Sequence, residues 1–383
     1  MTAGAERRPR QALMAQVSRL VVKVGSSSLT TRRHQLDRRV LRELVGDVIE
    51  LRRRGLQVAV VSSGAVAAGM GRLGLESRPR AVCDLQAVAA VGQNLLMQAY
   101  KTFFRRGQVP VGQVLLTAED ILEDRRRYLN LRNTFESLFG FGAVPIINEN
   151  DSVAVAELKR RIGENDMLAA YVTNLIRAQL LIILSDVEGL YAGYGPSGPQ
   201  GEVIRQVVNG EALPEPASGT RAGGVGSGGI HTKLRAARLL MASGEMTIIA
   251  HARRHRLLDL VDGADLGTLF LPAARKLRSR QRWIAFASPC RGSVTVDSGA
   301  ARAITQQDRS LLPAGVVGCR GDFGAGDVIR IENEKQQELA RGVSRYSAMD
   351  LRRIFGQSSS QVARELGRPA LEVVHRDDLV ILV

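Results

Sequence analysis

A lysine stands where a glycine-dense segment meets a helical pattern. Residues 223–233 read GGVGSGGIHTK, and apolar residues follow at the spacing of one helix face. Glycine lets backbone N–H groups approach an anion closely, and a helix N-terminus adds partial positive charge to the full charge of Lys233. The spacing differs from that of a Walker A sequence. The segment is suited to holding phosphate, and a flexible linker is the alternative interpretation.

A second lysine lies inside an apolar β-type segment. Lys23 belongs to residues 20–24, which end at the small residues Gly25 and Ser26. An ammonium group in such a strand needs an anionic partner or ligand, because burying a lone charge is unfavourable. A solvent-facing lysine on an edge strand is the alternative. The chain has 6 lysines among 53 basic residues, and two of them stand in these glycine motifs, which favours a phosphate site.

The elements that must position these lysines follow a regular order. Apolar β-type segments alternate with helical patterns from residue 19 to residue 272. This alternation predicts an α/β fold with a mostly parallel sheet sandwiched by helices. Ligands of such folds gather at the carboxyl ends of the strands. We therefore expect one site to be formed by the polar clusters that follow four predicted strands: Gly25–Ser27, Ser62–Ala65, Asn148–Asp151 and Ser185–Asp186.

Beyond Pro272 the pattern changes to short alternating segments separated by turn residues. This pattern predicts a small β-barrel-like domain with one or two helices, for which residues 300–305 and 348–355 are the candidates. The predicted organisation is a flexible N-terminal tail at 1–17, a first domain at 18–272, a linker at 273–282 and a second domain at 283–383.

Size and composition fit a globular protein of two domains, with 383 residues of which 45% are hydrophobic. No apolar segment approaches the length needed to span a membrane, and the N-terminus lacks the pattern of a signal peptide. We expect a cytoplasmic protein without membrane contact. Its three cysteines are too far apart in the chain to indicate a disulfide framework or a zinc site.

The net charge of +15 raises the hypothesis of a nucleic-acid partner. The excess is spread along the chain, however, with 18 basic and 12 acidic residues from residue 273 onward and the rest before it. A solvated arginine-rich surface or attraction for small anions explains it equally well. The basic residues at 275–282 form the best candidate stripe for RNA, and a polar linker is the simpler interpretation of that stretch.

Taken together, the motifs resemble the amino acid kinase family, and within it the glutamate 5-kinases that end in a PUA domain. The resemblance runs from about residue 18 to the C-terminus, where residues 342–346 and 374–378 are similar to the PUA region. It implies phosphorylation of the glutamate side-chain carboxylate by ATP with Mg²⁺, which gives L-glutamyl 5-phosphate and opens proline biosynthesis. Seven motifs carry it in family order: Lys23–Ser26, Val61–Gly69, Ala89–Gln93, Pro145–Asp151, Gly163–Asp166, Leu184–Tyr191 and Gly226–Lys233.

The resemblance also implies roles for single residues. A carboxylate nucleophile is already ionised at neutral pH, so the chemistry needs positioning and positive charge rather than a general base. We expect Lys23 and Lys233 to contact the transferred phosphoryl group, with Asp166 orienting them or engaging magnesium indirectly, and no direct protein ligand to the metal. A helix cap or Asx turn is the alternative for Asp166 and for Asp151. The glutamate contacts are assigned to Ser63, Asn148, Asp151 and Asn165, and the ATP contacts to Lys23, Gly25, Ser185, Asp186, Ser227, Gly228, Gly229, Ile230, His231, Thr232 and Lys233.

Several properties stay open at this point. The resemblance suggests a homodimer or homotetramer and feedback inhibition by proline, and a PUA domain leaves RNA open as a partner. The competing functions are another family member acting on aspartate, N-acetylglutamate or carbamate, and an RNA-binding protein. Ile230 and Ser185 stand where relatives often have Met and Thr, and Arg160-Arg161 lengthens the loop before Gly163. These departures concern affinity and feedback more than reaction type.

Overall fold

The structure is a computed structural model. It describes residues 9–31, 35–117, 120–121, 125–153, 165–195, 198–208, 229–272, 281, 284, 290–307 and 309–381. These residues fall into two compact units, one within Met1–Lys276 and the other within Leu277–Val383. Of the expected site residues, Ser227 and Gly228 lie outside the described ranges, as do Arg160-Arg161 and most of the expected linker at 273–282.

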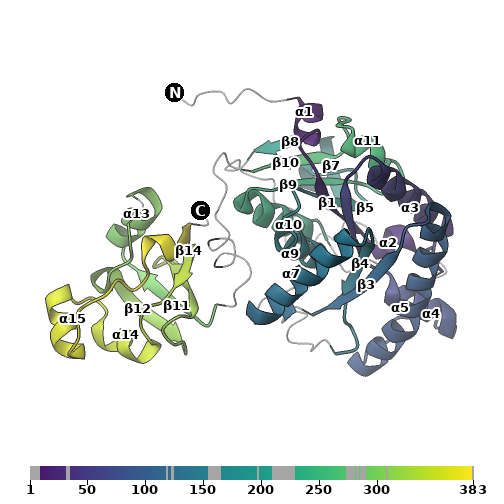
Figure 1. The fold of residues 1–383 in the computed structure, drawn as a ribbon. Helices are drawn as coiled ribbons and strands as arrows, with labels where there is room; N and C mark the ends of the chain where they lie inside the picture. Colours follow the sequence, from purple (N-terminus) through teal and green to yellow (C-terminus); the bar gives the residue numbers. More distant parts are fainter. Residues whose placement is uncertain are drawn as a thin grey trace. The chain divides into compact units, whose positions relative to one another are not determined.

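The first unit is built on an eight-stranded sheet with the order β3-β4-β2-β1-β5-β9-β10-β8 (Figure 1). All neighbouring strands are parallel except β9 and β10, which are antiparallel. A two-stranded hairpin lies outside this sheet. The sheet strands are β1 (Arg19–Val24), β2 (Gln57–Ser62), β3 (Val111–Leu116), β4 (Val144–Glu149), β5 (Leu180–Ser185), β8 (Gln206–Val208), β9 (Met246–His251) and β10 (Thr268–Leu271), and the hairpin is β6 (Tyr191–Gly195) with β7 (Gly198–Val203).

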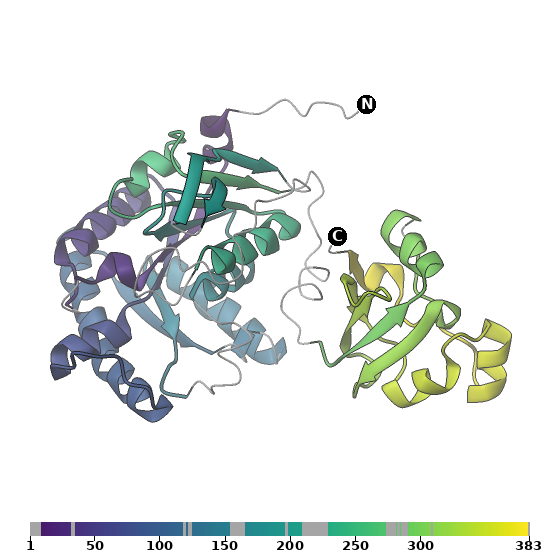
Figure 2. The same ribbon diagram turned by 180° about the vertical axis from the view of Figure 1, so that it is seen from behind.

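Helices cover both faces of this sheet, as the sequence predicts. Figures 1 and 2 show α3 and α5 on one face and α9 and α10 on the other. The helices of the unit are α1 (Arg10–Met14), α2 (Ser26–Leu29), α3 (Arg38–Arg53), α4 (Ala65–Leu73), α5 (Val82–Phe104), α7 (Arg125–Gly140), α9 (Asn165–Leu175), α10 (Ile230–Ser243) and α11 (Leu257–Val261), with a 3₁₀ turn η1 at Arg105–Gly107.

The alternation of side chains along β1 separates the core from the site. Leu20, Val22 and Val24 pack into the hydrophobic core shared with α3, α5 and α11. Successive side chains of a strand point to opposite faces, so Lys23 points to the face covered by α9 and α10. Strand β1 is central, with β2 on one side and β5 on the other, and this places its lysine in the middle of the sheet.

Residues 9–17 differ from the expected flexible tail. Residues 9–17 of the predicted tail 1–17 contain α1, and Met14 and Val17 are buried in the core of the first unit. The Arg10 guanidinium donates to the backbone oxygens of Ala264 and Leu266 at 2.8 and 2.7 Å. Burial of Met14 and Val17 and these two hydrogen bonds fix residues 9–17 to the first unit, although the composition of the N-terminus is basic.

The second unit contains a five-stranded sheet with the order β12-β11-β13-β14-β15. Only the β11–β13 pairing is parallel. Helix α15 was not expected, although Ser358 and Gln361 form a capping box at its start and Gly367 ends it in a left-handed conformation. The elements are β11 (Gly292–Val296), α13 (Ser298–Gln307), η3 (Pro313–Gly315), β12 (Val316–Gly321), β13 (Val328–Glu332), β14 (Glu338–Val343), α14 (Ala348–Ile354), α15 (Ser359–Leu366), η4 (Arg376–Asp378) and β15 (Leu379–Ile381).

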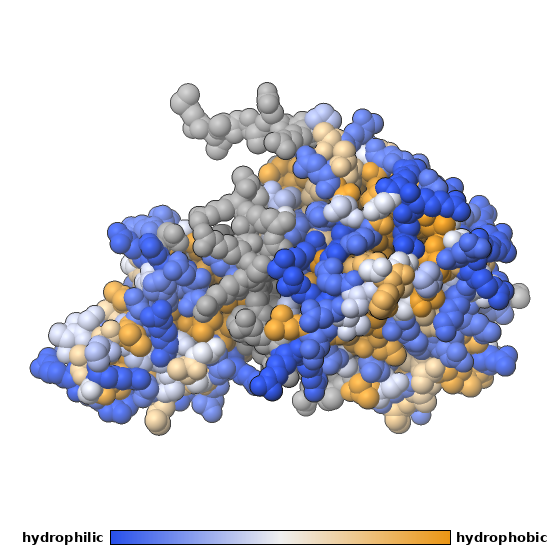
Figure 3. Space-filling model, in the orientation of Figure 1, coloured by the Kyte–Doolittle hydropathy of each residue, from blue (hydrophilic) through white to orange (hydrophobic). Residues whose placement is uncertain are grey.

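Figure 3 shows hydrophilic residues distributed over the visible face of each unit, with hydrophobic residues scattered between them. Among the helices of the described ranges, none has the length and apolar character needed to cross a bilayer. Cys83, Cys290 and Cys319 are free thiols.

Candidate active site

The two lysines of the glycine motifs meet at one carboxylate. Lys23 Nζ lies 2.6 Å from Asp166 Oδ1, and Lys233 Nζ lies 3.2 Å from Asp166 Oδ2. Lys23 comes from β1, Asp166 from the first turn of α9 and Lys233 from the first turn of α10. The three residues are almost completely buried, with exposed fractions of 5% for Lys23, 0% for Asp166 and 3% for Lys233. Lysines far apart in sequence thus converge on one buried point.

Asp166 is held ionised by its surroundings. Burial alone would raise the pKa of Asp166, but the charges of Lys23 and Lys233 and a hydrogen bond from Thr232 hold it below its ordinary value. The Thr232 hydroxyl lies 3.0 Å from Asp166 Oδ2. Asp166 is therefore an ion-pairing group rather than a helix cap. Two ammonium groups and one carboxylate leave the cluster with one excess positive charge, which suits an anionic ligand.

Gly25 lies directly beside this cluster. A Cβ at Gly25 would be 3.7 Å from Lys23 Nζ, so the missing side chain leaves room next to the ammonium group. The N–H of Gly25 donates to the backbone oxygen of Leu184 at 3.2 Å. In this structure it is engaged by the neighbouring strand and not directed at an open anion site.

Three of the expected glutamate contacts form a chain of hydrogen bonds. Asn165 Nδ2 donates to Ser63 Oγ at 2.7 Å and to Asn148 Oδ1 at 3.0 Å. Asn148 Nδ2 in turn donates to Gln93 Oε1 at 2.8 Å. Asn165 immediately precedes Asp166 in α9, so this amide chain begins next to the lysine cluster. The fourth expected contact, Asp151, is half-buried two residues beyond β4.

The remaining expected ATP contacts are more dispersed. Ser185 ends β5 and is buried, and its hydroxyl donates to the exposed Asp186 at 3.0 Å. At the start of α10, Gly229 is the N-cap residue, Ile230 is buried and His231 is exposed. The structure brings Thr232 and Lys233 to Asp166, whereas Ser185 and Asp186 contact each other.

Two side chains near the amide chain received no role from the sequence. Gln93 belongs to a quoted motif, yet only the fold reveals that it reaches Asn148. Tyr100 is fully buried and donates its hydroxyl to Ser62 Oγ at 2.9 Å, at the residue before Ser63. The sequence did contain one indication of this contact, because Gly92 precedes Gln93. A glycine in a helix permits close approach of another backbone, which would bring its neighbour close to another element.

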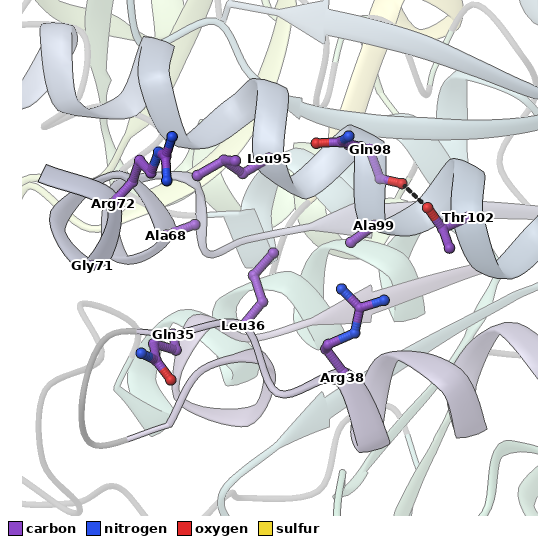
Figure 4. Close-up of a pocket in the computed structure, with 10 residues that line it drawn as sticks. All are labelled: Gln35, Leu36, Arg38, Ala68, Gly71, Arg72, Leu95, Gln98, Ala99 and Thr102. Carbon is purple, nitrogen blue, oxygen red and sulfur yellow. Dashed lines mark hydrogen bonds between the residues drawn. The ribbon is translucent and has the colours of Figure 1, made fainter.

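A separate pocket of about 480 Å³ lies where α4 and α5 face residues 35–38 (Figure 4). None of the expected site residues lines it. Figure 4 shows Arg38 and Arg72 among its polar lining and Leu36 and Leu95 among its apolar lining. We do not assign the catalytic site to it, because the buried lysines and the carboxylate lie elsewhere.

Within the described ranges, no group of three or more His, Cys, Asp or Glu side chains is arranged to hold a metal ion. Asp166, the carboxylate at the centre of the site, is already paired with both lysines. These residues fit a nucleotide that brings its own Mg²⁺ on its phosphates better than a cation bound by the protein.

Comparison with known proteins identifies both units. The model of the amino acid kinase family matches residues 18–250, and the model of the PUA domain matches residues 292–366. A glutamate 5-kinase of Citrifermentans bemidjiense is 44% identical over 375 residues, which cover 97% of this chain and 100% of that protein. A glutamate 5-kinase of Thermobifida fusca is 45% identical over 379 residues, covering 97% of this chain and 95% of the relative.

Proposed function

The chain belongs to the amino acid kinase family, and within it to the glutamate 5-kinases that carry a PUA domain, and from this premise we propose how its residues work. It phosphorylates the side-chain carboxylate of L-glutamate with ATP and forms L-glutamyl 5-phosphate, the first intermediate of proline biosynthesis. A bond forms between a glutamate carboxylate oxygen and the γ-phosphorus, and the bond from that phosphorus to the β–γ bridging oxygen breaks, which releases ADP.

The convergence of Lys23 and Lys233 on Asp166 is the observation that carries the proposed mechanism. Nucleophile and phosphate are both anionic, so the barrier contains a large repulsion that fixed positive charge relieves. The two ammonium groups neutralise the transferring oxygens, and Asp166 positions them. Mg²⁺ brought in on the ATP phosphates would supply further positive charge.

The substrate contacts follow from the polar residues at the neighbouring strand ends. We assign glutamate to Ser63, Asn148, Asp151 and Asn165, three of which share one hydrogen-bonded chain. Asp151 is the natural partner of the α-ammonium group. ATP is assigned to the lysine cluster, to Gly25, Ser185 and Asp186 and to residues 227–233, of which Gly229 caps α10 and residues 230–233 form its first turn.

Proline inhibition at or beside the glutamate pocket, assembly into a homodimer or homotetramer, and a cytoplasmic location are further proposals that family membership supports. The PUA domain is compatible with RNA binding. Electrostatic RNA binding would weaken steeply as salt rises, and this separates it from the kinase reaction.

Trapping of the product tests the proposed reaction. The purified chain is incubated with ATP, Mg²⁺ and hydroxylamine, which converts an acyl phosphate to a hydroxamate, and the substrates are glutamate, aspartate and N-acetylglutamate. We expect hydroxamate from glutamate at least tenfold faster than from the others, since a buried polar site rejects a mismatched ligand strongly. Product from N-acetylglutamate but none from glutamate would refute the assignment.

A further inference from the structure

The motif Ala89–Gln93 has no role in the mechanism above, although it lies against the site. A Cβ at Gly92 of α5 would fall 1.7 Å from the backbone oxygen of Ala65 in α4, and one at Gly69 of α4 would fall 2.0 Å from the oxygen of Val88. The two helices are therefore in backbone contact at these glycines. This close crossing holds the next residue, Gln93, at the carboxyl end of β4, where it meets Asn148.

One backbone donor fixes the orientation of Asn148. The N–H of Glu149 donates to Asn148 Oδ1 at 2.9 Å. A backbone N–H can only donate, so the side-chain atom that faces it must be the amide oxygen. Asn148 Nδ2 then points the other way, and Gln93 accepts from it through Oε1. The backbone of Glu149 thus fixes the amide oxygen of Asn148, and Gln93 fixes its amide nitrogen.

The orientation of Asn148 also determines which atoms of Asn165 and Ser63 donate and which accept. Because Asn148 presents its oxygen, Asn165 must present Nδ2, and that nitrogen donates to both Asn148 Oδ1 and Ser63 Oγ. An amide nitrogen has two hydrogens, so the donor capacity of Asn165 is used. Its Oδ1 is buried without a hydrogen-bond partner among the described residues. Ser63 accepts from Asn165, which leaves its own hydrogen to donate elsewhere.

We propose that Gln93 is a positioning residue of the glutamate site, which it orients through Asn148. This inference rests on the proposed function. Asn165 Oδ1 offers the α-ammonium group an acceptor in addition to Asp151. Ser63 offers a hydroxyl donor to a substrate carboxylate. A substrate that lacks the ammonium group leaves Asn165 Oδ1 buried and unpartnered, so the arrangement selects for a free amino acid.

The test removes the acceptor of Gln93 while keeping the shape of the side chain. In Gln93→Met we expect the KM for glutamate to rise about tenfold, the effect of one hydrogen bond, with kcat and the KM for ATP changed less than about threefold. Gln93→Glu keeps an acceptor for Asn148 Nδ2 and is expected to restore the KM to within about threefold. Gln98→Met, on the exposed side of the same helix, is the matched control and leaves all three constants unchanged.

Glutarate, which is glutamate without the ammonium group, separates positioning from general damage. We expect Gln93→Met to lower kcat/KM for glutamate about tenfold but for glutarate less than about threefold. Equal losses with both substrates, or a loss confined to kcat, would overturn the inference, as would failure of Gln93→Glu to restore the KM. A parent protein inactive on glutamate would overturn the proposed function as well, so the two failures are distinguishable.

Discussion

The two ends of the site satisfy their buried groups in different ways. At the charged end, Lys23 and Lys233 both pair with Asp166, inside the protein and without a ligand. At the neutral end, the hydrogen-bonded amides leave Gln93 Nε2 and Asn165 Oδ1 buried without partners among the described residues. The carboxylate of the charged end is therefore ion-paired before substrate binds, and that end keeps one excess positive charge for an anionic ligand. The neutral end instead has uncharged polar atoms that a ligand can satisfy.

This difference follows from the free energies of the groups involved. Removing one partner of a buried ion pair destabilises a protein by about 3–5 kcal/mol, whereas one unsatisfied amide atom costs about 1–3 kcal/mol. A chain of marginal stability tolerates one or two unsatisfied amide atoms but not a lone buried charge. We infer that the charged end is preorganised for catalysis and the neutral end is adapted for recognition.

The largest expected effect is at the charged end. Lys233→Met removes one of two charges at the transferring phosphoryl group, so kcat should fall about 100- to 1,000-fold. Release of ADP measures the rate, and thermal unfolding reports whether the remaining Lys23–Asp166 pair keeps the fold. Lys101→Met, at an exposed lysine of α5, is the control and should retain full activity. If kcat of Lys233→Met falls less than tenfold, the inference that the charged end serves catalysis and the neutral end serves recognition is wrong.

A second prediction concerns the helix crossing that supports the neutral end. Gly92→Ala forces a methyl group into the backbone of Ala65, so the free energy of unfolding should fall by about 1–3 kcal/mol or more. The KM for glutamate should rise because Gln93 is displaced. Gly46→Ala in α3 is the matched control, since nothing lies within 4 Å of its added Cβ, and it should stabilise the helix by about 0.5–1 kcal/mol. Chemical denaturation measures the free energy of unfolding of both variants. Equal changes in Gly92→Ala and Gly46→Ala would contradict the close backbone contact between α4 and α5.

A smaller effect is expected at Tyr100, which supports the strand end before Ser63. Burial raises the pKa of Tyr100, against a smaller lowering by its hydrogen bond to Ser62, so the phenol stays neutral. Tyr100→Phe removes that bond, and the free energy of unfolding should fall by about 0.5–1.5 kcal/mol. The KM for glutamate should change less than about threefold. A larger change in KM would extend the recognition end to Tyr100.

The smallest effect at neutral pH comes from the titration of Asp166. Its pKa is lowered in the folded state, so it contributes stability that is present above the unfolded value of about 3.9 and is lost as pH falls through the folded value. Stability should therefore be insensitive to this group from pH 6 to 8, and the difference between the parent and Asp166→Asn should shrink below about pH 4. A difference that grows on acidification would contradict the ion-paired state.

The sequence predicted the mostly parallel sheet and the polar clusters at the ends of four of its strands, because apolar segments that alternate with helical patterns are typical of such a sheet. It also singled out Lys23, Lys233 and Asp166. It did not predict the antiparallel β10 or the packing of α1, which depend on distant partners. The role of Gln93 was also out of reach, since it depends on the register of α5 against α4 and on one N–H of Glu149.

Strand β1 carries core residues and Lys23 on alternate faces. A slip of one residue in its pairing with β2 and β5 would turn the ammonium group into the aliphatic core and place Leu20, Val22 and Val24 on the face covered by α9 and α10. Single-residue insertions or deletions within β1 should consequently abolish folding altogether, rather than give an intact but inactive enzyme. Selection for a chain that folds therefore also preserves the register that places Lys23 in the site.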